Sequence, residues 1–370
     1  MSHFSTLFDF LSPVNIHLLS EDEGYSNEQI GKLIRVYDDR LPDITEAEIV
    51  LVGCGEERGA GSEREINLAP DAIRAEFYRL FHWHKDVPIA DLGNIRPGAS
   101  LPDTLAALRT VISELTELGK TVVILGGSHD LTLAQYYAYA GRNEIVEATC
   151  VDARINLSIE SPLRSENFLM EMLTGEPNFI RHYNHIAFQS YYAHPDMLET
   201  MDKLRFDCYR VGRVKEHIEE MEPVIRNSRL FSFDIAALAH AYAPASSSPN
   251  GLTGEDACML LQYAGLSREV NTVGIYGFSP SKDKEGLTAK QISQMLWYLL
   301  DGRSRCRQEA LLNARRHSSN FPSPSAKLTP FFYKAGKPAA GGCSCRIKTS
   351  LPVPKKITSP PAETKSPNAG

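Results

Sequence analysis

Three short polar motifs, each placed directly after an apolar run, constrain the fold of this chain more than any other feature. They are Gly-Gly-Ser-His-Asp at 126–130, Val-Asp-Ala-Arg-Ile-Asn at 151–156 and Ser-Phe-Asp-Ile-Ala at 232–236. Short β-rich runs followed by helical patterns predict parallel strands whose carboxyl ends meet at one crevice. We therefore expect His129, Asp152 and Asp234 to converge there.

Strand and helix patterns alternate along most of the chain. The expected strands are 48–52, 88–92, 121–125, 148–151, 185–189, 208–211, 229–233 and 272–276. The expected helices are 27–37, 70–81, 102–118, 196–204, 215–227 and 287–300. Such a regular succession predicts a mainly parallel sheet with helices on both faces.

The motifs resemble those of the ureohydrolases, the family of arginase, agmatinase and formimidoylglutamase. The family pattern reads Gly-Gly-x-His, then Asp-Ala-His-x-Asp, then Ser-Phe-Asp-x-Asp. Weaker matches support the same alignment, at 52–58, 69–74, 91–94 and 249–253. The resemblance covers roughly residues 45 to 300. It implies an α/β fold of the arginase type, a three-layer sandwich with a mainly parallel sheet and helices on both faces.

The resemblance also implies a dinuclear metal site, of which half the ligands are missing here. In the family, six residues of these motifs hold two manganese ions that activate water for attack on an amidine or guanidine carbon. His129, Asp152 and Asp234 match this pattern, whereas Arg154 stands for a histidine, Asn156 for an aspartate and Ala236 for an aspartate.

The losses fall unevenly on the two metal positions. The second ion would need donors from residues 154 and 236, beside the shared Asp152 and Asp234. Alanine has no side-chain donor atom, and a guanidinium is a permanent cation without an acceptor. Two unit charges about 4 Å apart interact by about 4 kcal/mol at an effective dielectric near 20, so a guanidinium would oppose a divalent ion by roughly twice that. We expect no metal at the second position.

The first position keeps more of its ligands. Asn156 still offers a carbonyl oxygen of the kind that hard cations accept. The candidate metal ligands are therefore His129, Asp152, Asn156 and Asp234. We expect the Arg154 guanidinium to pair with Asp152 and Asp234 and so to replace metal charge. The expected cofactor content is then none, or at most one manganese ion.

Two further parts of the family's chemistry are missing. Gly277 stands where the family has a glutamate that holds the cationic group of the substrate, and residues 158–170 contain no histidine where the family has a proton shuttle. We assign no catalytic residue. The sequence predicts a ureohydrolase-fold protein, similar to formimidoylglutamase and agmatinase, that has lost its dinuclear manganese centre and acts as a non-catalytic binding or scaffold protein.

Two alternatives stay open. One is a metal-dependent hydrolase of a linear amidine or guanidine C–N bond, in a formimidoylglutamate-, agmatine- or arginine-like substrate, at a degenerate one-metal site. The other is a small-molecule sensor that keeps the crevice as a ligand pocket. Taken singly, His129, Asp152 and Asp234 fit packing or helix capping as well as function; their joint fit to one pattern favours common ancestry with the hydrolases.

Composition limits the partners and the cellular location that we expect for the protein. The net charge is −7 and no basic stripe precedes residue 300, which argues against a nucleic-acid partner. No apolar stretch approaches the roughly 20 residues that span a bilayer, and residues 1–20 do not resemble a secretory signal. The seven scattered cysteines are typical of reduced thiols. We predict a cytoplasmic protein with a small amidine or amino-acid-like ligand, and homo-oligomers are left open.

Three segments are expected along the chain. Residues 1–45 form a lead-in that packs on the core, and residues 46–302 form the α/β domain. Residues 303–370 form a tail that is basic and loop-like at first, then rich in proline and serine and largely disordered. Its stretches at 322–325 and 352–356 are of a kind that binds partner proteins in the polyproline conformation, against the simpler interpretation of a flexible tail without a partner.

Overall fold

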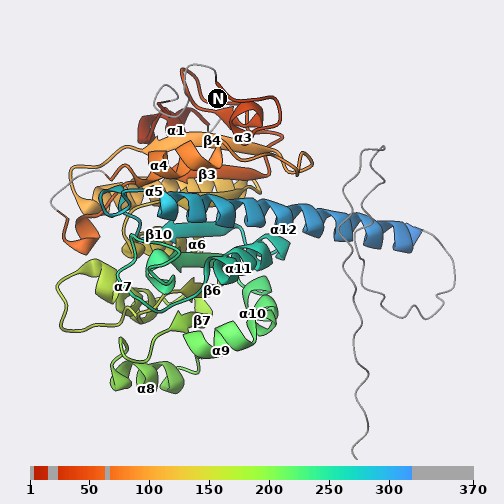
Figure 1. The fold of residues 1–370 in the computed structure, drawn as a ribbon. Coiled ribbons are helices and arrows are strands. Elements are labelled where there is room, and N and C mark those ends of the chain that lie inside the picture. Colours follow the sequence, from red (N-terminus) through yellow and green to blue (C-terminus); the bar gives the residue numbers. More distant parts are fainter. Residues whose placement is uncertain (1–3, 16–23, 63–66, 319–370) are drawn as a thin grey trace, which may run out of the picture. The chain divides into compact units, whose positions relative to one another are not determined.

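Mainly apolar runs that are buried along their whole length form four central strands of the sheet, at Ile49–Gly53, Thr121–Leu125, Leu230–Asp234 and Thr272–Tyr276. The computed structural model describes residues 4–15, 24–62 and 67–318, which fall in one unit of the chain. The strands are β1 (Leu11–Ser12), β2 (Arg35–Val36), β3 (Ile49–Gly53), β4 (Ile89–Ile95), β5 (Thr121–Leu125), β6 (Val146–Val151), β7 (Ile180–Phe188), β8 (Asp207–Arg210), β9 (Leu230–Asp234) and β10 (Thr272–Tyr276). They form a ten-stranded sheet in the order β1-β4-β3-β5-β10-β9-β6-β7-β8, with β2 beside β4 (Figure 1). All pairs are parallel except β1 with β4.

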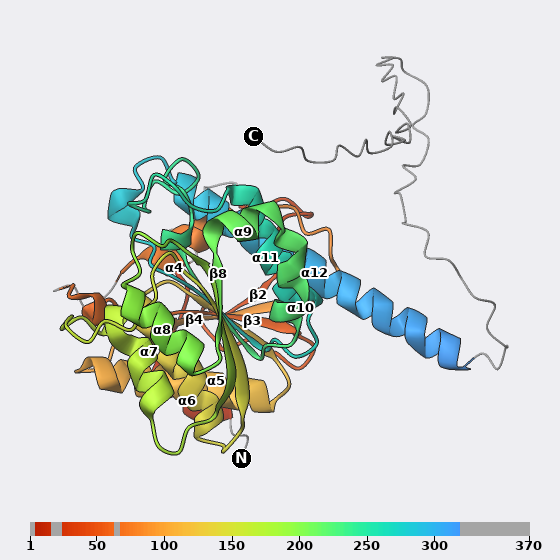
Figure 2. The same ribbon diagram turned by 90° about the horizontal axis from the view of Figure 1, so that it is seen from below.

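Helices cover both faces of this sheet. They are α1 (Phe4–Phe10), α3 (Ile30–Leu33), α4 (Ala69–Phe77), α5 (Leu101–Glu117), α6 (Thr132–Ala140), α7 (Arg164–Thr174), α8 (Pro195–Lys203), α9 (Val211–Glu216), α10 (Met221–Arg226), α11 (Gly254–Leu266) and α12 (Leu287–Ser318). Figure 2 shows the twisted sheet between a layer with α4, α11 and α12 and a layer with α5, α6 and α7. The predicted fold class, a three-layer α/β sandwich, is confirmed.

Alternation along β3 contributes to two separate cores, one on each face of the sheet. Ile49 and Leu51 of β3 pack with α4, α11 and α12 on one face. Val50 and Val52 of the same strand pack with α5 and α6 on the other face. Because successive side chains of a strand point to opposite faces, one continuous apolar run supplies both cores.

The register of the central strands brings three motif ends to one edge of the sheet. Val151 of β6 is level with Phe233 of β9, and Asp234 is level with Tyr276 of β10. The residues that directly follow β5, β6, β9 and β10 therefore lie side by side at the carboxyl edge, which is where ligands bind in open α/β sheets.

Two expected helices are wrong in extent. In place of a helix over 27–37, the chain forms α3 and then β2. The helix expected over 215–227 is divided into α9, a 3-10 turn at Ile218–Glu220 and α10. The chain leaves the helical conformation at His217, which has φ −139° and ψ 57°, and Pro223 lies in the first turn of α10, where proline is tolerated.

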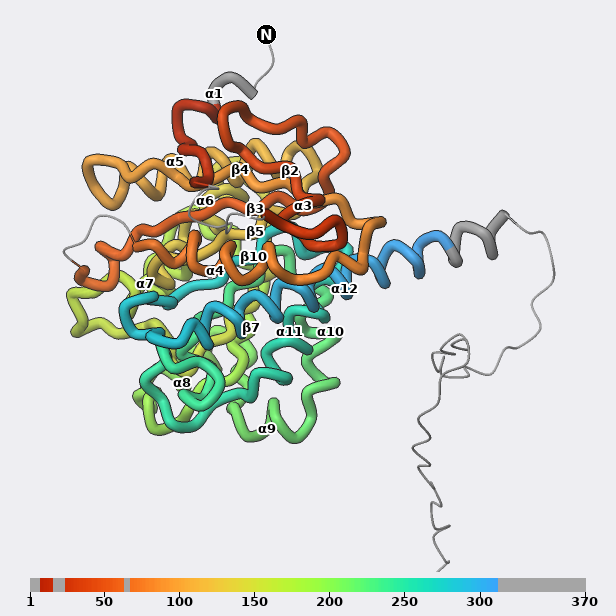
Figure 3. The backbone as a smooth tube through the Cα atoms, turned by 45° about the horizontal axis from the view of Figure 1, so that its top comes forward, coloured from red at the N-terminus to blue at the C-terminus, as the bar shows by residue number. Residues whose placement is uncertain are grey.

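The last helix is longer than expected. We predicted its end at residue 300 and a loop-like segment from 303, but α12 continues to Ser318 and runs beside α4 (Figure 3). Arg303 is buried and donates hydrogen bonds to the backbone oxygens of Ser267 (2.9 Å) and Val270 (3.0 Å). The basic composition of this segment therefore partly reflects packing. The predicted disorder of 335–370 and the proline-rich stretches lie outside the described residues.

Two other expectations concern single features. No helix within the described ranges is both long enough and apolar enough to cross a membrane. The described cysteines form no disulfide, and Cys54, Cys150, Cys258 and Cys306 are buried.

Candidate metal and ligand-binding site

The first motif is a tight turn that only glycine permits. After β5, Gly126 and Gly127 have φ of +85° and +81°, a region that residues with a side chain rarely adopt. A Cβ atom on Gly127 would lie 2.3 Å from Leu131 Cδ1 and 2.7 Å from the Cys54 oxygen. This turn places His129 at the start of a 3-10 helix (His129–Leu131), directly above the carboxyl edge of the sheet.

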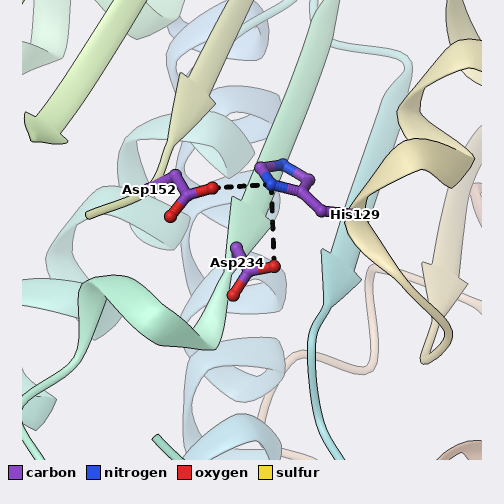
Figure 4. A group of neighbouring side chains, drawn as sticks. All are labelled: His129, Asp152 and Asp234. Atoms are coloured by element: carbon purple, nitrogen blue, oxygen red, sulfur yellow. Dashed lines mark hydrogen bonds and ion pairs between the residues drawn. The ribbon is translucent and has the colours of Figure 1, made fainter. Parts of the chain in front are cut away.

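His129, Asp152 and Asp234 meet at this edge (Figure 4). His129 Nδ1 lies 2.8 Å from Asp152 Oδ2 and 3.6 Å from Asp234 Oδ2. One ligand atom of each residue lies within 4.8 Å of the others. All three residues are at most 9 % exposed. The sequence placed these side chains together, and the geometry agrees; their role as metal ligands stays a prediction.

Hydrogen bonds from the protein fix these side chains. His129 Nε2 lies 2.8 Å from Ser232 Oγ, which lies 2.7 Å from Thr132 Oγ1. Such a partner on the far nitrogen fixes the ring orientation and leaves Nδ1 facing the carboxylates. We missed Ser232 in the sequence, although a serine between Phe231 and Phe233 in a buried strand was a usable signal.

Asp152 has donors on both of its oxygens. Its Oδ2 accepts from Asn156 Nδ2 at 2.8 Å, in addition to the contact with His129. Its Oδ1 accepts from the backbone N–H of Arg154 at 3.0 Å. The fourth candidate ligand, Asn156, is therefore also in the cluster, with its amide nitrogen towards Asp152.

The charges in this cluster stabilise one another. Burial opposes the charged ring of His129, but the hydrogen bond with Asp152 and the nearby carboxylates outweigh it, so the pKa of His129 is raised well above its usual value. Burial, followed by repulsion from Asp152, raises the pKa of Asp234 to about 7. Burial also acts on Asp152, yet the hydrogen bond and charge of His129 lower its pKa. The arrangement is that of a buried imidazolium between two carboxyl groups.

The expected pairing of Arg154 with Asp152 and Asp234 is wrong. The Arg154 guanidinium lies over the Tyr192 ring, 5.4 Å from its centroid, and Nη1 is 3.6 Å from Glu166 Oε1. The side chain is 51 % exposed. An exposed guanidinium stays hydrated, and the Asp152 oxygens already have donors, so there is little to draw this side chain inwards. His129 is the cation beside the two carboxyl groups.

The cluster forms the floor of a crevice with a volume of about 500 Å³. Glu57 and Gly277 line its wall, and Arg154 and Lys282 line its mouth. The sequence identified Arg154 and Gly277 but missed Glu57 and Lys282, because these two come from loops that only the fold brings to the site.

The side chains present do not fit a pair of metal ions. Ala236 contributes only its N–H, which donates to Asp234 Oδ1 at 2.7 Å, and the Arg154 side chain is a cation that points away. One ion is a different matter. An imidazole nitrogen and two carboxylate oxygens that converge within 4.8 Å are a donor set that first-row transition metals accept.

Comparisons with known proteins agree with the fold. The family model described as the arginase family matches residues 47–301. A formimidoylglutamase of Staphylococcus haemolyticus is 23 % identical over 62 % of this chain and 78 % of its own length. A formimidoylglutamase of Streptococcus gordonii is 22 % identical over 75 % of this chain and 92 % of its own length.

A solved structure has the same fold. A formiminoglutamase of Trypanosoma cruzi, solved with manganese, superposes with a TM-score of 0.65 at 14 % identity. The superposition covers 75 % of this chain and 99 % of that one. At this identity the similarity establishes the fold alone. The chemistry of the site in this chain must be argued from its own residues.

Proposed function

Because this chain belongs to the arginase family, by its match over residues 47–301, we propose that it is a ureohydrolase-fold protein that binds a small ligand in the crevice without performing the family's hydrolysis. One observation carries the proposal. At the second metal position, the two side chains that are not shared with the first position offer no donor, since residue 236 is alanine and the Arg154 guanidinium pairs with Glu166 at the mouth.

The rest of the hydrolytic machinery supports the same conclusion. A side chain at position 277 does not fit this site, because a Cβ there would lie 2.5 Å from Asp234 Oδ1. The glutamate that holds the substrate in the family therefore has no equivalent at its own position. Residues 158–170 contain no histidine for proton transfer. Metal binding, substrate recognition and proton transfer are each altered.

The experiment is elemental analysis together with an assay of amidine hydrolysis. Protein purified without chelator is equilibrated with excess manganese, and bound metal is counted by mass spectrometry. We expect fewer than two equivalents and no release of ammonia, urea or formamide from linear amidines and guanidines. Two equivalents of manganese with turnover would overturn the proposal.

One observation favours a second candidate, a hydrolase with a single metal ion. His129, Asp152 and Asp234 converge as a triad, and reversal of the Asn156 amide would present its oxygen to the same point. A bound ion would supply a Lewis acid for an amidine C–N bond, while the protein would orient it through Ser232 behind His129. About one equivalent of metal with turnover, both lost in His129→Ala, would establish this candidate in place of the first.

A further inference from the structure

A second cavity lies at the amino edge of the sheet. Its volume is about 210 Å³, and Arg35 and Ile89 are among the residues that line it. Arg35 begins β2 and Ile89 begins β4, and the two strands pair in parallel. The cavity therefore lies where these strands begin, whereas the crevice with His129 lies where the strands end. The two sites are separate.

Most of the cavity wall is apolar. Ile34, Ala47 and Ile89 are at most 9 % exposed, and the wall also contains Leu33 and Pro88. Sites for drug-sized molecules usually have volumes of about 300 to 1,000 Å³. This cavity is smaller, so it fits a small ligand with a short apolar body.

One buried histidine also lines the cavity. His82 follows α4 and is 6 % exposed. Its backbone N–H donates to the oxygen of Glu28 at 2.8 Å, which holds the segment in place. Within the part of the chain that the structure describes, Nδ1 of its ring has no hydrogen-bond partner. A buried polar atom without a partner costs free energy and is uncommon in native proteins, so a ligand that completes this contact is favoured.

The neighbouring histidine does not turn this place into a metal site. His84 Nε2 lies 3.4 Å from Asp301 Oδ1, and the His84 ring packs on Trp297 with centroids 4.9 Å apart. Among the described residues, the side chains that converge as a set of three possible metal ligands are those of the crevice. Burial, followed by the proximity of His84, lowers the pKa of His82. The His82 ring is therefore neutral at pH 7, with one N–H that either nitrogen can carry.

The charged groups that line the cavity are both cations. Arg35 and Lys85 line it and are exposed, and no described residue of the wall is acidic. Arg35 Nη1 donates to a backbone oxygen, that of Asp43, at 2.9 Å. Lys85 Nζ lies 3.0 Å from Glu28 Oε2, but these side chains are 60 % and 65 % exposed, and such pairs contribute little. This charge favours an anionic ligand group.

We propose that this cavity binds a small organic monocarboxylate with a short hydrocarbon body. Arg35 and Lys85 bind the carboxylate, His82 donates a hydrogen bond to it, and the apolar wall contacts the hydrocarbon. The site needs neither a metal ion nor the crevice, so it goes beyond the proposed function and does not depend on it.

The test is isothermal titration of the full chain at low ionic strength with two probes of the same shape. The first probe is 3-methylbutanoate, which is anionic, and the second is 3-methylbutanamide, its neutral isostere. We expect the carboxylate to bind at least about tenfold more tightly than the amide, the ratio expected for charge-assisted hydrogen bonds. Equal binding of the two probes, or binding of neither, would overturn the inference.

Arg35→Gln tests the charge at the cavity. Glutamine keeps an N–H that can donate to the oxygen of Asp43, so the change removes the charge and little else. We expect the affinity for 3-methylbutanoate to fall about fivefold, and Arg35→Lys, which keeps the charge, to retain most of it. The matched control is Arg181→Gln, which removes an exposed positive charge on β7 and should bind as the wild type does. Unchanged affinity in Arg35→Gln would contradict the assignment.

His82→Phe tests the ring nitrogens, because phenylalanine keeps a ring and removes both of them. We expect the affinity for 3-methylbutanoate to fall about tenfold. The variant without ligand should be at least as stable as the wild type in urea, since a buried nitrogen without a partner has been removed. Lower stability with unchanged affinity would show that these nitrogens bind the protein and not a ligand, and would overturn the role of His82.

The mouth of the crevice is the other place where cations line a cavity, so the site of binding has to be established. Arg154→Gln removes the positive charge there and should leave the affinity for 3-methylbutanoate unchanged. If Arg154→Gln lowers this affinity and Arg35→Gln does not, the carboxylate binds in the crevice and the inference is wrong. Neither result bears on whether the crevice hydrolyses amidines.

Discussion

The proton on His129 and a metal ion would compete for the same atom. Nδ1 faces Asp152 Oδ2 at 2.8 Å and is protonated when the ring is charged, whereas a ligand to metal must present a lone pair. The neighbouring carboxyl groups raise the pKa of His129, so a metal ion that binds here must displace this proton.

Asp234 gives a prediction about stability and pH. Its pKa is about 7 in the folded protein against an ordinary value of 3.8, so between these values the folded state holds a proton that the unfolded state releases. Stability from this group therefore falls as pH rises from about 4 to 7. We expect Asp234→Asn to gain stability relative to wild type over this range, on the order of 3 kcal/mol.

The measurement is urea unfolding of both proteins in EDTA at several pH values. A difference between them that stays constant from pH 4 to 7 would contradict the raised pKa. The oxygen of asparagine can still accept from the N–H of Ala236, so the local backbone should be preserved.

Gly277 is expected to be structurally required. In Gly277→Ala, the backbone keeps a φ of +79° that alanine disfavours, and the new Cβ meets Asp234 Oδ1 at 2.5 Å. We expect a loss of about 1–3 kcal/mol in the free energy of unfolding, measured by chemical denaturation. The control is Gly212→Ala, in the first turn of α9, where a Cβ meets no atom within 4 Å. A Gly277→Ala protein as stable as this control would disprove the requirement.

For Arg154, the sequence allowed a prediction from the residue type but not of the direction of the side chain. Its type excluded a metal ligand, and that conclusion needs no structure. The direction of its side chain depends on Glu166 and Tyr192, which approach only after α7 and the end of β7 are in place. The neutralising cation was therefore assigned to Arg154 when the geometry gives that role to His129.

At the scale of elements, α4 is attached to β4 by a buried ion pair. Arg74 donates to Asp91 from Nε at 2.8 Å and from Nη2 at 2.9 Å, and Tyr78 donates to the same carboxylate at 2.8 Å. Arg74 and Asp91 are completely buried. This network fixes α4 on β4, on the face of the sheet that α11 and α12 also cover.

Removal of one partner should be costly. Arg74→Leu leaves Asp91 buried without its cation, and we expect a loss of about 3–5 kcal/mol in the free energy of unfolding. Arg213→Leu breaks the exposed pair with Glu220 (3.0 Å) and should cost less than about 1 kcal/mol. Denaturant titration measures the free energy of unfolding of both variants. Equal losses in the two would show that the buried ion pair contributes no more to stability than the exposed one.

Helices and strands could be predicted from the sequence where a segment is buried along its whole length. They were harder to predict where the extent of a helix depends on a partner that is distant in the sequence. The expected strand 121–125 coincides with β5 because an uninterrupted apolar run must be buried on both faces. The end of α12 was missed because Arg303 has its hydrogen-bond partners at Ser267 and Val270, which the local sequence does not reveal. The helix α6, after the first motif, was not expected at all.

At the scale of the molecule, the site depends on strand order. Its groups follow β5, β10, β9 and β6, which are adjacent in the sheet although β10 is the last strand in the chain. The sequence placed the three motifs at one edge by the general rule for parallel sheets. It could not place Glu57 in the crevice, because the loop after β3 reaches the first motif only when β3 lies beside β5.

The same architecture predicts which part of the ancestral chemistry can be restored. The triple variant Arg154→His, Asn156→Asp and Ala236→Asp returns every metal ligand of the family pattern to a fold that already holds His129, Asp152 and Asp234 in place. We expect two equivalents of manganese by elemental analysis, against fewer than two in the wild type. The loss of one positive and the gain of two negative charges make the metal-free variant less stable. Manganese at about a hundredfold excess over its Kd should stabilise it by about 2.7 kcal/mol for each ion bound.

Hydrolysis of amidines should remain absent in this variant. Residue 277 stays glycine, and no histidine is gained in 158–170, so substrate orientation and proton transfer are not restored with the metal. The same variant carrying His129→Ala is the control and should lose at least one equivalent of manganese. A folded triple variant that binds no manganese would show that the three motifs do not occupy the positions of the family's ligands, whereas one that binds two ions and hydrolyses an amidine would show that metal loss alone accounts for the lost activity.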